Sequence, residues 1–256
     1  MDRDALRALF DLTDRVAVVT GGTRGIGRAI AEGFAAAGAN VVVASRKADA
    51  CAETEAHLIA LGGEALGVPT HLGDLDAVAA LVGRTMDRFS RLDIVVNNAA
   101  TPLTMPIGQL TPEAWQKSFD VNLRGPVFLV QDALPHLEAS PCAAIVNVIS
   151  AGAFLFSPNV SMYAAAKAAL MSFTRAMAAD FAPRGIRVNA LAPGSVDTDM
   201  MRKTAPEAQA SMAAASHQAR AASTDEMVGP ALFLASDAAS FVTGQVLIAD
   251  GGLVPH

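Results

Sequence analysis

A tyrosine and a lysine four residues apart are the side chains of this sequence best suited to proton transfer. Tyr163 is the only tyrosine, and Lys167 is one of four lysines. They lie in an alanine-rich segment that favours a helix, where residues four apart share one face. A free phenol has a pKa near 10, and a neighbouring ammonium lowers it by stabilising the phenolate. The pair therefore predicts a general acid/base, with a packed interface tyrosine and a solvated lysine as the alternative.

A serine is the third candidate for this chemistry. Ser150 follows the apolar run 144–149, where we expect a buried strand to end. Its hydroxyl is placed to donate to the substrate oxygen that Tyr163 would protonate.

Length and composition limit the class of protein. With 256 residues, 52% of them hydrophobic, the chain fits one α/β domain or two small ones and can build a large core. A net charge of −6 and the lack of a basic run argue against a nucleic-acid surface. No apolar run approaches the roughly 20 residues that cross a bilayer, and the first residues have no signal-like apolar core. We therefore expect neither nucleic-acid nor membrane partners.

Cysteine and histidine usage points to a reducing compartment and to no metal. Cys51 and Cys142 are isolated thiols, so a disulfide framework is not expected and the cytoplasm is the default location. The five histidines show no metal-ligand spacing.

Short β-branched runs alternate with alanine-rich helical segments along the whole chain. We expect strands at residues 16–20, 40–45, 65–69, 93–97, 144–150, 186–190 and 245–249. We expect helices at residues 25–37, 48–61, 75–89, 112–137, 161–181 and 224–236. Continuous apolar strands separated by helices are typical of a parallel sheet covered on both faces. The pattern predicts an α/β fold: a single doubly wound, Rossmann-like domain over residues 1–256, with a seven-stranded parallel sheet.

A glycine-rich turn follows the first expected strand. Gly21, Gly25 and Gly27 have the spacing Gly-x3-Gly-x-Gly, which differs from the general G-x-G-x-x-G fingerprint. Such glycines let the backbone approach a pyrophosphate at a helix N-terminus. The turn predicts a dinucleotide site, although any strand-to-helix turn can require a glycine.

The end of the second expected strand bears on the choice of dinucleotide. An acidic residue there would bind the ribose of NAD, but this chain has Ser45, Arg46 and Lys47. Guanidinium groups bind a 2′-phosphate, and Arg24 of the glycine turn is a second candidate. We expect NADP(H) in preference to NAD(H), unless Arg46 and Lys47 merely begin a solvated helix.

From about residue 15 to residue 252, the sequence resembles the short-chain dehydrogenase/reductase family, including NADP(H)-dependent carbonyl reductases and 3-oxoacyl-ACP reductases. The resemblance rests on the glycine turn, Asn97-Asn98-Ala99-Ala100, Val121-Asn122-Leu123, Ser150, Tyr163-x3-Lys167 and Pro193-Gly194-Ser195-Val196-Asp197-Thr198. It departs from the family's usual pattern at Ala100, where a glycine is common, and at His71, where an aspartate often binds the adenine. His71 would stack on or hydrogen-bond the base, or simply fill space.

The resemblance implies a role for each catalytic candidate. Tyr163 would be the general acid/base and Ser150 would polarise the substrate carbonyl. Lys167 would hold the nicotinamide ribose and lower the pKa of Tyr163, and Asn122 would anchor a water that relays protons.

The resemblance also implies a cofactor site. Asn98 would lie against the adenosine side, and Thr198 would bind the nicotinamide carboxamide. The residues expected to hold the cofactor are Gly21, Thr23, Arg24, Gly25, Ile26, Gly27, Ser45, Arg46, Lys47, His71, Leu72, Asn98, Ala99, Tyr163, Lys167, Pro193, Gly194, Val196 and Thr198.

Three loops beyond the strand ends are expected to bind the substrate: residues 101–110, 151–162 and 199–222. The third is expected to be a flexible lid. The pocket residues expected from these loops are Ala151, Phe154, Phe156, Met200 and Met201. Their side chains predict a largely apolar substrate, or alternatively a subunit interface.

The expected function is hydride transfer between NADP(H) and a carbonyl or secondary alcohol of a small to medium substrate. A 3-oxoacyl-ACP or CoA reductase is the alternative, for which Arg184 matches a carrier-binding position and Pro141 does not. A noncatalytic nucleotide sensor is more remote, because the Tyr-Lys pair is complete. An epimerase or dehydratase would need further acid/base groups.

The C-terminal segment and two long helices are expected to form subunit contacts. Residues 245–253 resemble the family's last strand and tail, and the helices at 112–137 and 161–181 carry few charges. We expect a homotetramer, with a dimer as the fallback.

Overall fold

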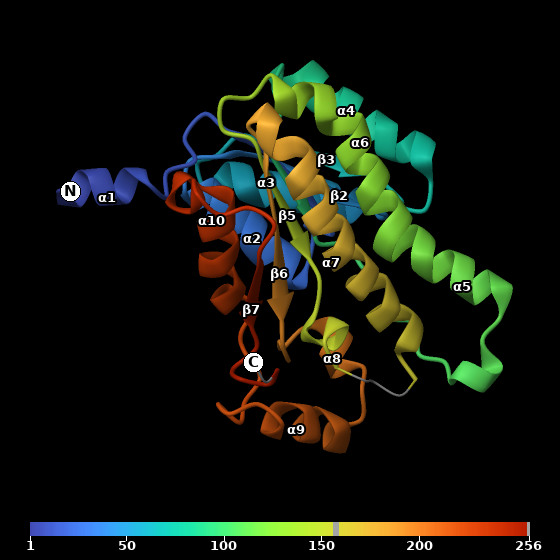
Figure 1. Ribbon diagram of the computed structural model, residues 1–256. Helices are drawn as coiled ribbons and strands as arrows, with labels where there is room; N and C mark the ends of the chain where they lie inside the picture. The colour runs from blue at the N-terminus through green and yellow to red at the C-terminus, as the bar shows by residue number, and fades with distance from the viewer. Residues whose placement is uncertain (156–158, 255–256) are drawn as a thin grey trace.

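Seven parallel strands form one sheet in the order β3-β2-β1-β4-β5-β6-β7 (Figure 1). The computed structural model describes residues 1–155 and 159–254. The strands are β1 Val16–Thr20, β2 Asn40–Ser45, β3 Ala65–Pro69, β4 Ile94–Asn97, β5 Ala144–Val148, β6 Arg187–Pro193 and β7 Val246–Ala249. The order reverses between β1 and β4, which makes the sheet doubly wound and opens a crevice at the strand C-termini. The predicted fold class is confirmed.

Helices cover both faces of the sheet because the strands are apolar on both sides. In β1, Val16 and Val18 pack against α4, α6 and α7, whereas Ala17 and Val19 pack against α2, α3 and α10. These helices are α2 Gly25–Ala36, α3 Ala48–Ala60, α4 Leu75–Phe89, α6 Gly125–Glu138, α7 Ser161–Phe181 and α10 Val228–Ala235. Strand β7 forms one edge of the sheet, and its side chains are only half-buried.

The prediction of one continuous helix over residues 112–137 is wrong. The segment is divided into α5 Pro112–Phe119, a π-helical turn Asp120–Arg124, and α6. The hydrophobic period continues through the turn, so the sequence pattern alone does not reveal it.

Other boundaries also differ from the prediction. Strand β5 ends at Val148, two residues before Ser150, while β6 extends to Pro193. The helix predicted at residues 224–236 begins as a 3-10 turn and becomes α10 at Val228. Two short helices, α8 Asp199–Arg202 and α9 Pro206–Ala214, lie within the predicted lid.

An unexpected N-terminal helix, α1 Arg3–Ala8, projects away from the body of the protein (Figure 1). It contains no buried residue. The chain joins the body of the protein just after this helix. The backbone carbonyl of Leu9 accepts a hydrogen bond from the N–H of Ala238, and the side chain of Leu12 is fully buried in the core.

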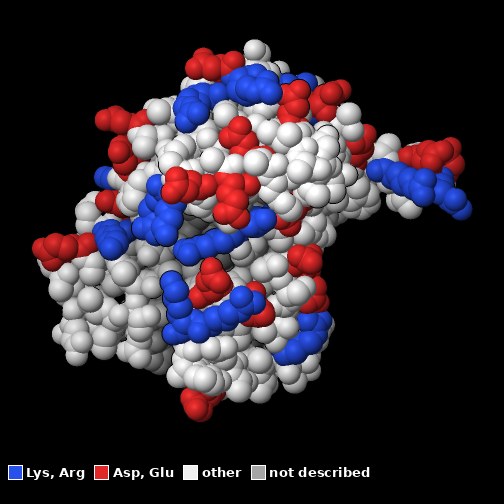
Figure 2. Space-filling model, turned by 180° about the vertical axis from the view of Figure 1, so that it is seen from behind, with Lys and Arg blue, Asp and Glu red and all other residues white. Residues whose placement is uncertain are grey.

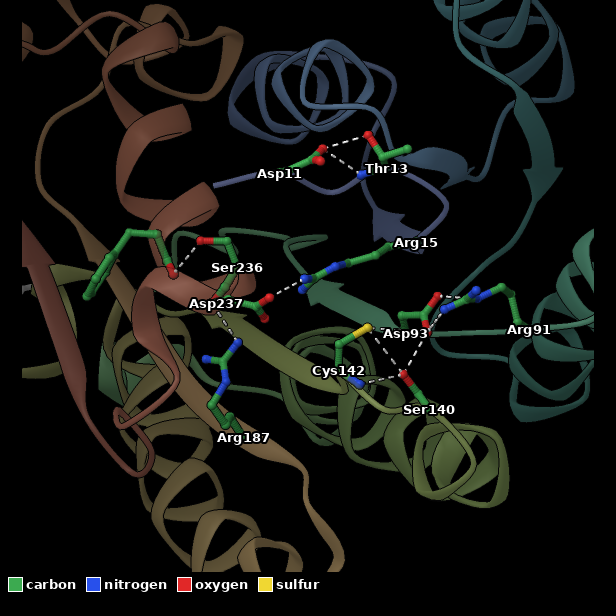
Figure 3. Close-up of polar contacts among 11 residues, drawn as sticks. Asp11, Thr13, Arg15, Arg91, Asp93, Ser140, Cys142, Arg187, Ser236 and Asp237 are labelled. Carbon is green, nitrogen blue, oxygen red and sulfur yellow. Dashed lines mark hydrogen bonds and ion pairs between the residues drawn. The ribbon is translucent and has the colours of Figure 1, made fainter. Parts of the chain in front are cut away.

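A cluster of charged and polar side chains lies at the amino ends of the strands (Figure 3). The buried carboxylate of Asp93 accepts two hydrogen bonds from Arg91 at 2.8 Å and one from Ser140 at 2.6 Å. It also accepts one from the backbone of Val16, so it ties β1 to the start of β4. Nearby, Arg15 bonds Asp237 at 2.7 Å. This cluster lies at the opposite end of the sheet from the glycine turn.

Candidate active site

Ser150 and Tyr163 meet beyond the carboxyl end of β5. Ser150 has an extended backbone after the strand, and its hydroxyl accepts a hydrogen bond from Gly152 at 3.1 Å. Tyr163 lies in the first turn of α7 and is half-buried. Burial raises the pKa of Tyr163, and a hydrogen bond from Ser150 partly offsets this. The structure thus brings together the two groups expected to contact a substrate oxygen.

Lys167 lies one turn further along α7 and is 1% exposed. Its ammonium donates to the backbone carbonyl of Val148 at 2.7 Å and lies over the Tyr163 ring, 5.8 Å from the centroid. Burial lowers the pKa of Lys167 from 10.5 to about 8. The expected lowering of the Tyr163 pKa by Lys167 is therefore not what this structure shows: desolvation outweighs other influences, and the pKa is raised.

Asn122 lies in the π-helical turn and is fully buried. Its amide donates to the carbonyl of Thr101 and accepts from the amide of Thr101, both at 2.9 Å, and it also donates to Ser118 at 3.2 Å. These bonds fasten the segment after β4 to the turn between α5 and α6. The expected role of Asn122 in a proton relay stays a prediction.

The glycine turn is shaped for close approach of a ligand. Gly21 and Gly25 have φ values of 66° and 55°, which side-chain-bearing residues rarely adopt. A Cβ at Gly27 would lie 2.3 Å from the Asn98 amide and 2.4 Å from the carbonyl of Gly21. Asn98 in turn donates to Thr20 at 2.9 Å. The loop therefore presents bare backbone at the N-terminus of α2, as a pyrophosphate site requires.

The remaining residues of this turn are arranged around it. Thr23 is half-buried, Ile26 packs against the core, and Ala99 donates its backbone N–H to Thr20 at 3.1 Å. The guanidinium of Arg24 is exposed and lies 3.9 Å from Asp199 at the start of α8.

The ends of β2 and β3 reach the same crevice. Ser45 ends β2, and the exposed Arg46 and Lys47 follow it before α3. After β3, Leu72 is buried in the core, whereas His71 is exposed and accepts a hydrogen bond from Gly73 at 3.0 Å. Its exposure argues against the space-filling alternative for His71.

The end of β6 brings the last predicted cofactor residues beside the glycine turn. Gly194 follows Pro193, and a Cβ there would lie 2.7 Å from Asp250. Val196 is buried, and Thr198 caps α8. A Cβ at Gly25 would lie 3.4 Å from the Thr198 methyl group, so the two segments are in contact.

The predicted substrate residues are less closely gathered. Ala151 is buried beside Ser150, Met201 is half-buried, and Phe154 and Met200 are 37% and 41% exposed. Phe156 lies outside the described residues. Of the four described, none lines the cavity of about 360 Å³ between the end of β7 and Arg220, or the cavity of about 630 Å³ beside His71.

Sequence reasoning missed a set of buried polar residues beneath the site. Asn97 and Asn147 occupy neighbouring positions on β4 and β5, and Thr174 lies on α7. A polar residue within an otherwise continuous apolar strand is the signal that marks the two asparagines. In the part of the chain that the structure describes, no helix is long and apolar enough to span a membrane, and no group of His, Cys, Asp or Glu is arranged to hold a metal.

Comparisons with known proteins agree with this arrangement. A family model described as enoyl-(acyl carrier protein) reductase matches residues 21–254. A short chain dehydrogenase/reductase from Aspergillus oryzae is 40% identical over 95% of this chain and 96% of its own length. A cis-4-hydroxycyclohexanecarboxylate dehydrogenase from Sinomonas cyclohexanicum is 41% identical over 93% of this chain and 96% of its own length.

A solved structure shows the same fold. The 3-oxoacyl (acyl-carrier-protein) reductase from Agrobacterium tumefaciens, crystallised with NADP bound, superposes with a TM-score of 0.90 at 37% identity. The match covers 96% of this chain and 97% of that one. The chain therefore belongs to the short-chain dehydrogenase/reductase family.

Proposed function

We propose that the protein is an oxidoreductase that transfers hydride between a nicotinamide cofactor and a carbonyl or secondary alcohol. The observation that carries this proposal is the approach of the Ser150 hydroxyl to the Tyr163 phenol beside a buried Lys167, at the strand ends where the glycine turn opens. A small to medium, largely apolar substrate would lie between this pair and the loops that carry Ala151 and Met201. When bound, the nicotinamide supplies or accepts the hydride.

Side chains of the protein donate and stabilise the proton that the carbonyl oxygen receives. Because the pKa of Tyr163 is raised, its phenol stays protonated at neutral pH and is ready to donate to a carbonyl oxygen. Ser150 donates a second hydrogen bond to that oxygen and stabilises the charge that develops there. Lys167, whose pKa is about 8, keeps a positive charge near the phenol at neutral pH, which favours the phenolate left after proton transfer.

Replacement of the phenol hydroxyl tests the proposal. Tyr163→Phe removes the proton donor and keeps the ring, so we expect turnover of every carbonyl substrate to fall by about 100-fold or more. Binding of NADPH, measured by fluorescence titration, should not change. Wild-type turnover is first established with a panel of ketones, diketones and secondary alcohols; full activity of Tyr163→Phe would refute the mechanism.

We infer that NADP(H) is the preferred cofactor. The turn of Gly21, Gly25 and Gly27 would hold the pyrophosphate, and the exposed Arg46 and Arg24 would bind the 2′-phosphate. Lys and Arg side chains lie around a hollow on the face drawn in Figure 2, with acidic groups among them. The NADP bound to the Agrobacterium relative supports the same preference.

The reduction of 3-oxoacyl thioesters is the second candidate function, because the Agrobacterium relative is described as a 3-oxoacyl (acyl-carrier-protein) reductase. Against it, Arg184 is already engaged by Glu138 at 2.8 Å and lies over the ring of Phe181. A comparison of acetoacetyl-CoA with simple ketones at equal concentration separates the two candidates.

We propose a homotetramer in the cytoplasm, with residues 199–222 as a substrate lid. Trp115 is 49% exposed although it stacks on Phe119, and Phe173 of α7 is 42% exposed, so α5 and α7 present apolar surface for a partner. Strand β7 offers a second contact at the sheet edge. Light scattering that gives a monomer at micromolar concentration would refute the tetramer. Hydrogen exchange of residues 199–222 that does not change when substrate is added to the NADP(H) complex would refute the lid.

A further inference from the structure

A chain of buried hydrogen bonds links the two central strands to the helix that carries Tyr163. The amide of Asn97 donates to the amide oxygen of Asn147 at 2.9 Å, and Asn147 donates to the hydroxyl of Thr174 at 2.9 Å. Thr174 donates to the carbonyl of Leu170 at 2.8 Å. The three side chains are at most 1% exposed, so each bond forms away from bulk water.

The donors and acceptors along this chain are mutually consistent. Thr174 has a single hydroxyl proton, which goes to Leu170, so its oxygen accepts from Asn147. Asn147 must then present its oxygen to Asn97. Loss of the Thr174 oxygen would leave the Asn147 amide buried with a donor unpaired, which is energetically costly.

Asn147 and Thr174 lie on the strand and the helix that position the reactive groups. Asn147 precedes Val148 in β5, and Ser150 follows the strand. On α7, Thr174 lies two helical turns after Lys167, whose ammonium bonds the carbonyl of Val148. The helix is therefore attached to neighbouring residues of β5 by two polar contacts.

Apolar packing alone would define the position of α7 less sharply. Leu170, between Lys167 and Thr174, belongs to a small apolar cluster with Ile149, Ala190 and Ala192. Such contacts are non-directional, whereas a hydrogen bond weakens steeply as its angle changes. The polar contacts therefore resist a shift of α7 along its own axis.

We propose that Asn147 and Thr174 are positioning residues that fix the register of α7 against β5, and with it the placement of Tyr163 relative to Ser150. They act through Tyr163 and Lys167 and do not themselves contact the substrate. The consequence for turnover rests on the proposed oxidoreductase function, whereas the consequence for the helix does not.

The chain offers a closely matched control for removing the Thr174 hydroxyl. Thr85 of α4 is also fully buried in a helix, and its hydroxyl donates to Leu81 four residues earlier at 2.8 Å. Among the described residues, no side chain donates to Thr85. Thr85→Val therefore reports the general cost of losing a buried helical hydroxyl, and Thr174→Val adds the loss of the link to β5.

The first measurement compares kcat and cofactor affinity in Thr174→Val, Thr174→Ser and Thr85→Val. A displacement of about 1 Å can cost about 100-fold in rate, so we expect kcat of Thr174→Val to fall by roughly 10-fold to 100-fold. Thr174→Ser, which keeps the oxygen, should restore kcat, and the Kd for NADPH should stay at the wild-type value in Thr85→Val. Equal kcat values for Thr174→Val and Thr85→Val would overturn the proposal.

The second measurement does not require activity. Amide hydrogen exchange of residues 161–171 should be faster in Thr174→Val than in wild type or Thr85→Val, because α7 loses its second attachment to β5. If wild type turns over no substrate, the proposed function fails, and hydrogen exchange alone tests the positioning role. Exchange of residues 161–171 that is the same in Thr174→Val and wild type would then overturn the positioning role. Should Thr174→Val not fold, Thr174→Ala with Thr85→Ala as control is measured in the same way.

Discussion

Replacement of Lys167 by methionine is expected to stabilise the protein while it abolishes turnover. The lysine is 1% exposed, and its ammonium donates a hydrogen bond to the carbonyl of Val148. Methionine has a similar length and no charge, so it occupies the same space without the cost of burying an ammonium. Lys167→Met should therefore be more stable than wild type in the absence of ligands.

The size of the effect follows from the pKa of the buried ammonium. Burial lowers this pKa from 10.5 to about 8. At about 1.4 kcal/mol per pKa unit, the folded state is destabilised by about 3 kcal/mol wherever Lys167 is charged in both states. Loss of the hydrogen bond to Val148 offsets about 1 kcal/mol, which leaves a net gain of about 2 kcal/mol in the free energy of unfolding at pH 7.

The gain in the free energy of unfolding of Lys167→Met should decrease as pH rises above 8. Below pH 8, Lys167 is protonated in both the folded and the unfolded wild type, so the full penalty applies. Between pH 8 and pH 10.5 the unfolded chain binds more protons than the folded one, and wild type becomes more stable as pH rises. The advantage of Lys167→Met therefore shrinks over this interval.

Urea unfolding at pH 7 and at pH 10, at one protein concentration, provides the assay. Lys203→Met is the matched control, because Lys203 is exposed and its replacement removes no buried charge. A variant less stable than wild type at pH 7, or a gain that is the same at both pH values, would refute the reasoning.

Two further changes test the buried charge cluster and the cofactor preference. Asp93→Asn removes the carboxylate that accepts from Arg91, Ser140 and Val16, and should cost about 3 kcal/mol at pH 7. Burial raises the pKa of Asp93, but these hydrogen bonds lower it by more, so the stabilisation is present above the unfolded pKa and lost as pH falls through the folded one. The stability gap between wild type and Asp93→Asn in urea should thus persist at pH 7 and narrow only below about pH 4; a gap that is absent at pH 7 contradicts this role. Arg46→Asp should weaken NADPH binding by about 10-fold and spare NADH, as measured by fluorescence titration, because a carboxylate repels a 2′-phosphate; an equal loss for both cofactors would count against phosphate recognition.

The strands could be predicted closely because most are runs of β-branched and apolar residues, and the central strands β1, β4 and β5 are buried throughout. Their alternation with helices was enough to predict a doubly wound sheet, and the reactive pair Tyr163–Lys167 was visible from helical spacing. The π-helical turn was not predictable from the local pattern, and the contact that Asn122 makes within it, to Thr101, spans 21 positions of sequence. The raised pKa of Tyr163 was missed for a similar reason: desolvation is set by the packed surroundings, which no local pattern reveals.

The buried network illustrates a further limit. Asn97 and Asn147 stand out as polar residues in apolar strands, but Thr174 looks like an ordinary helix residue until the fold places it beside Asn147. The substrate residues are the least predictable part, because Phe154 and Met200 lie on loops and are partly exposed. Loop side chains are positioned by contacts that a residue-type pattern does not encode.

The projecting helix α1 has a practical use. With no buried residue, it contributes little to the core, and it projects from the body (Figure 1) before the start of β1, whereas the glycine turn follows the other end of that strand. An affinity tag or a surface linker attached at Met1 would therefore leave the catalytic crevice open. The removable portion ends near Leu9, since Leu12 lies fully buried a short distance further along the chain.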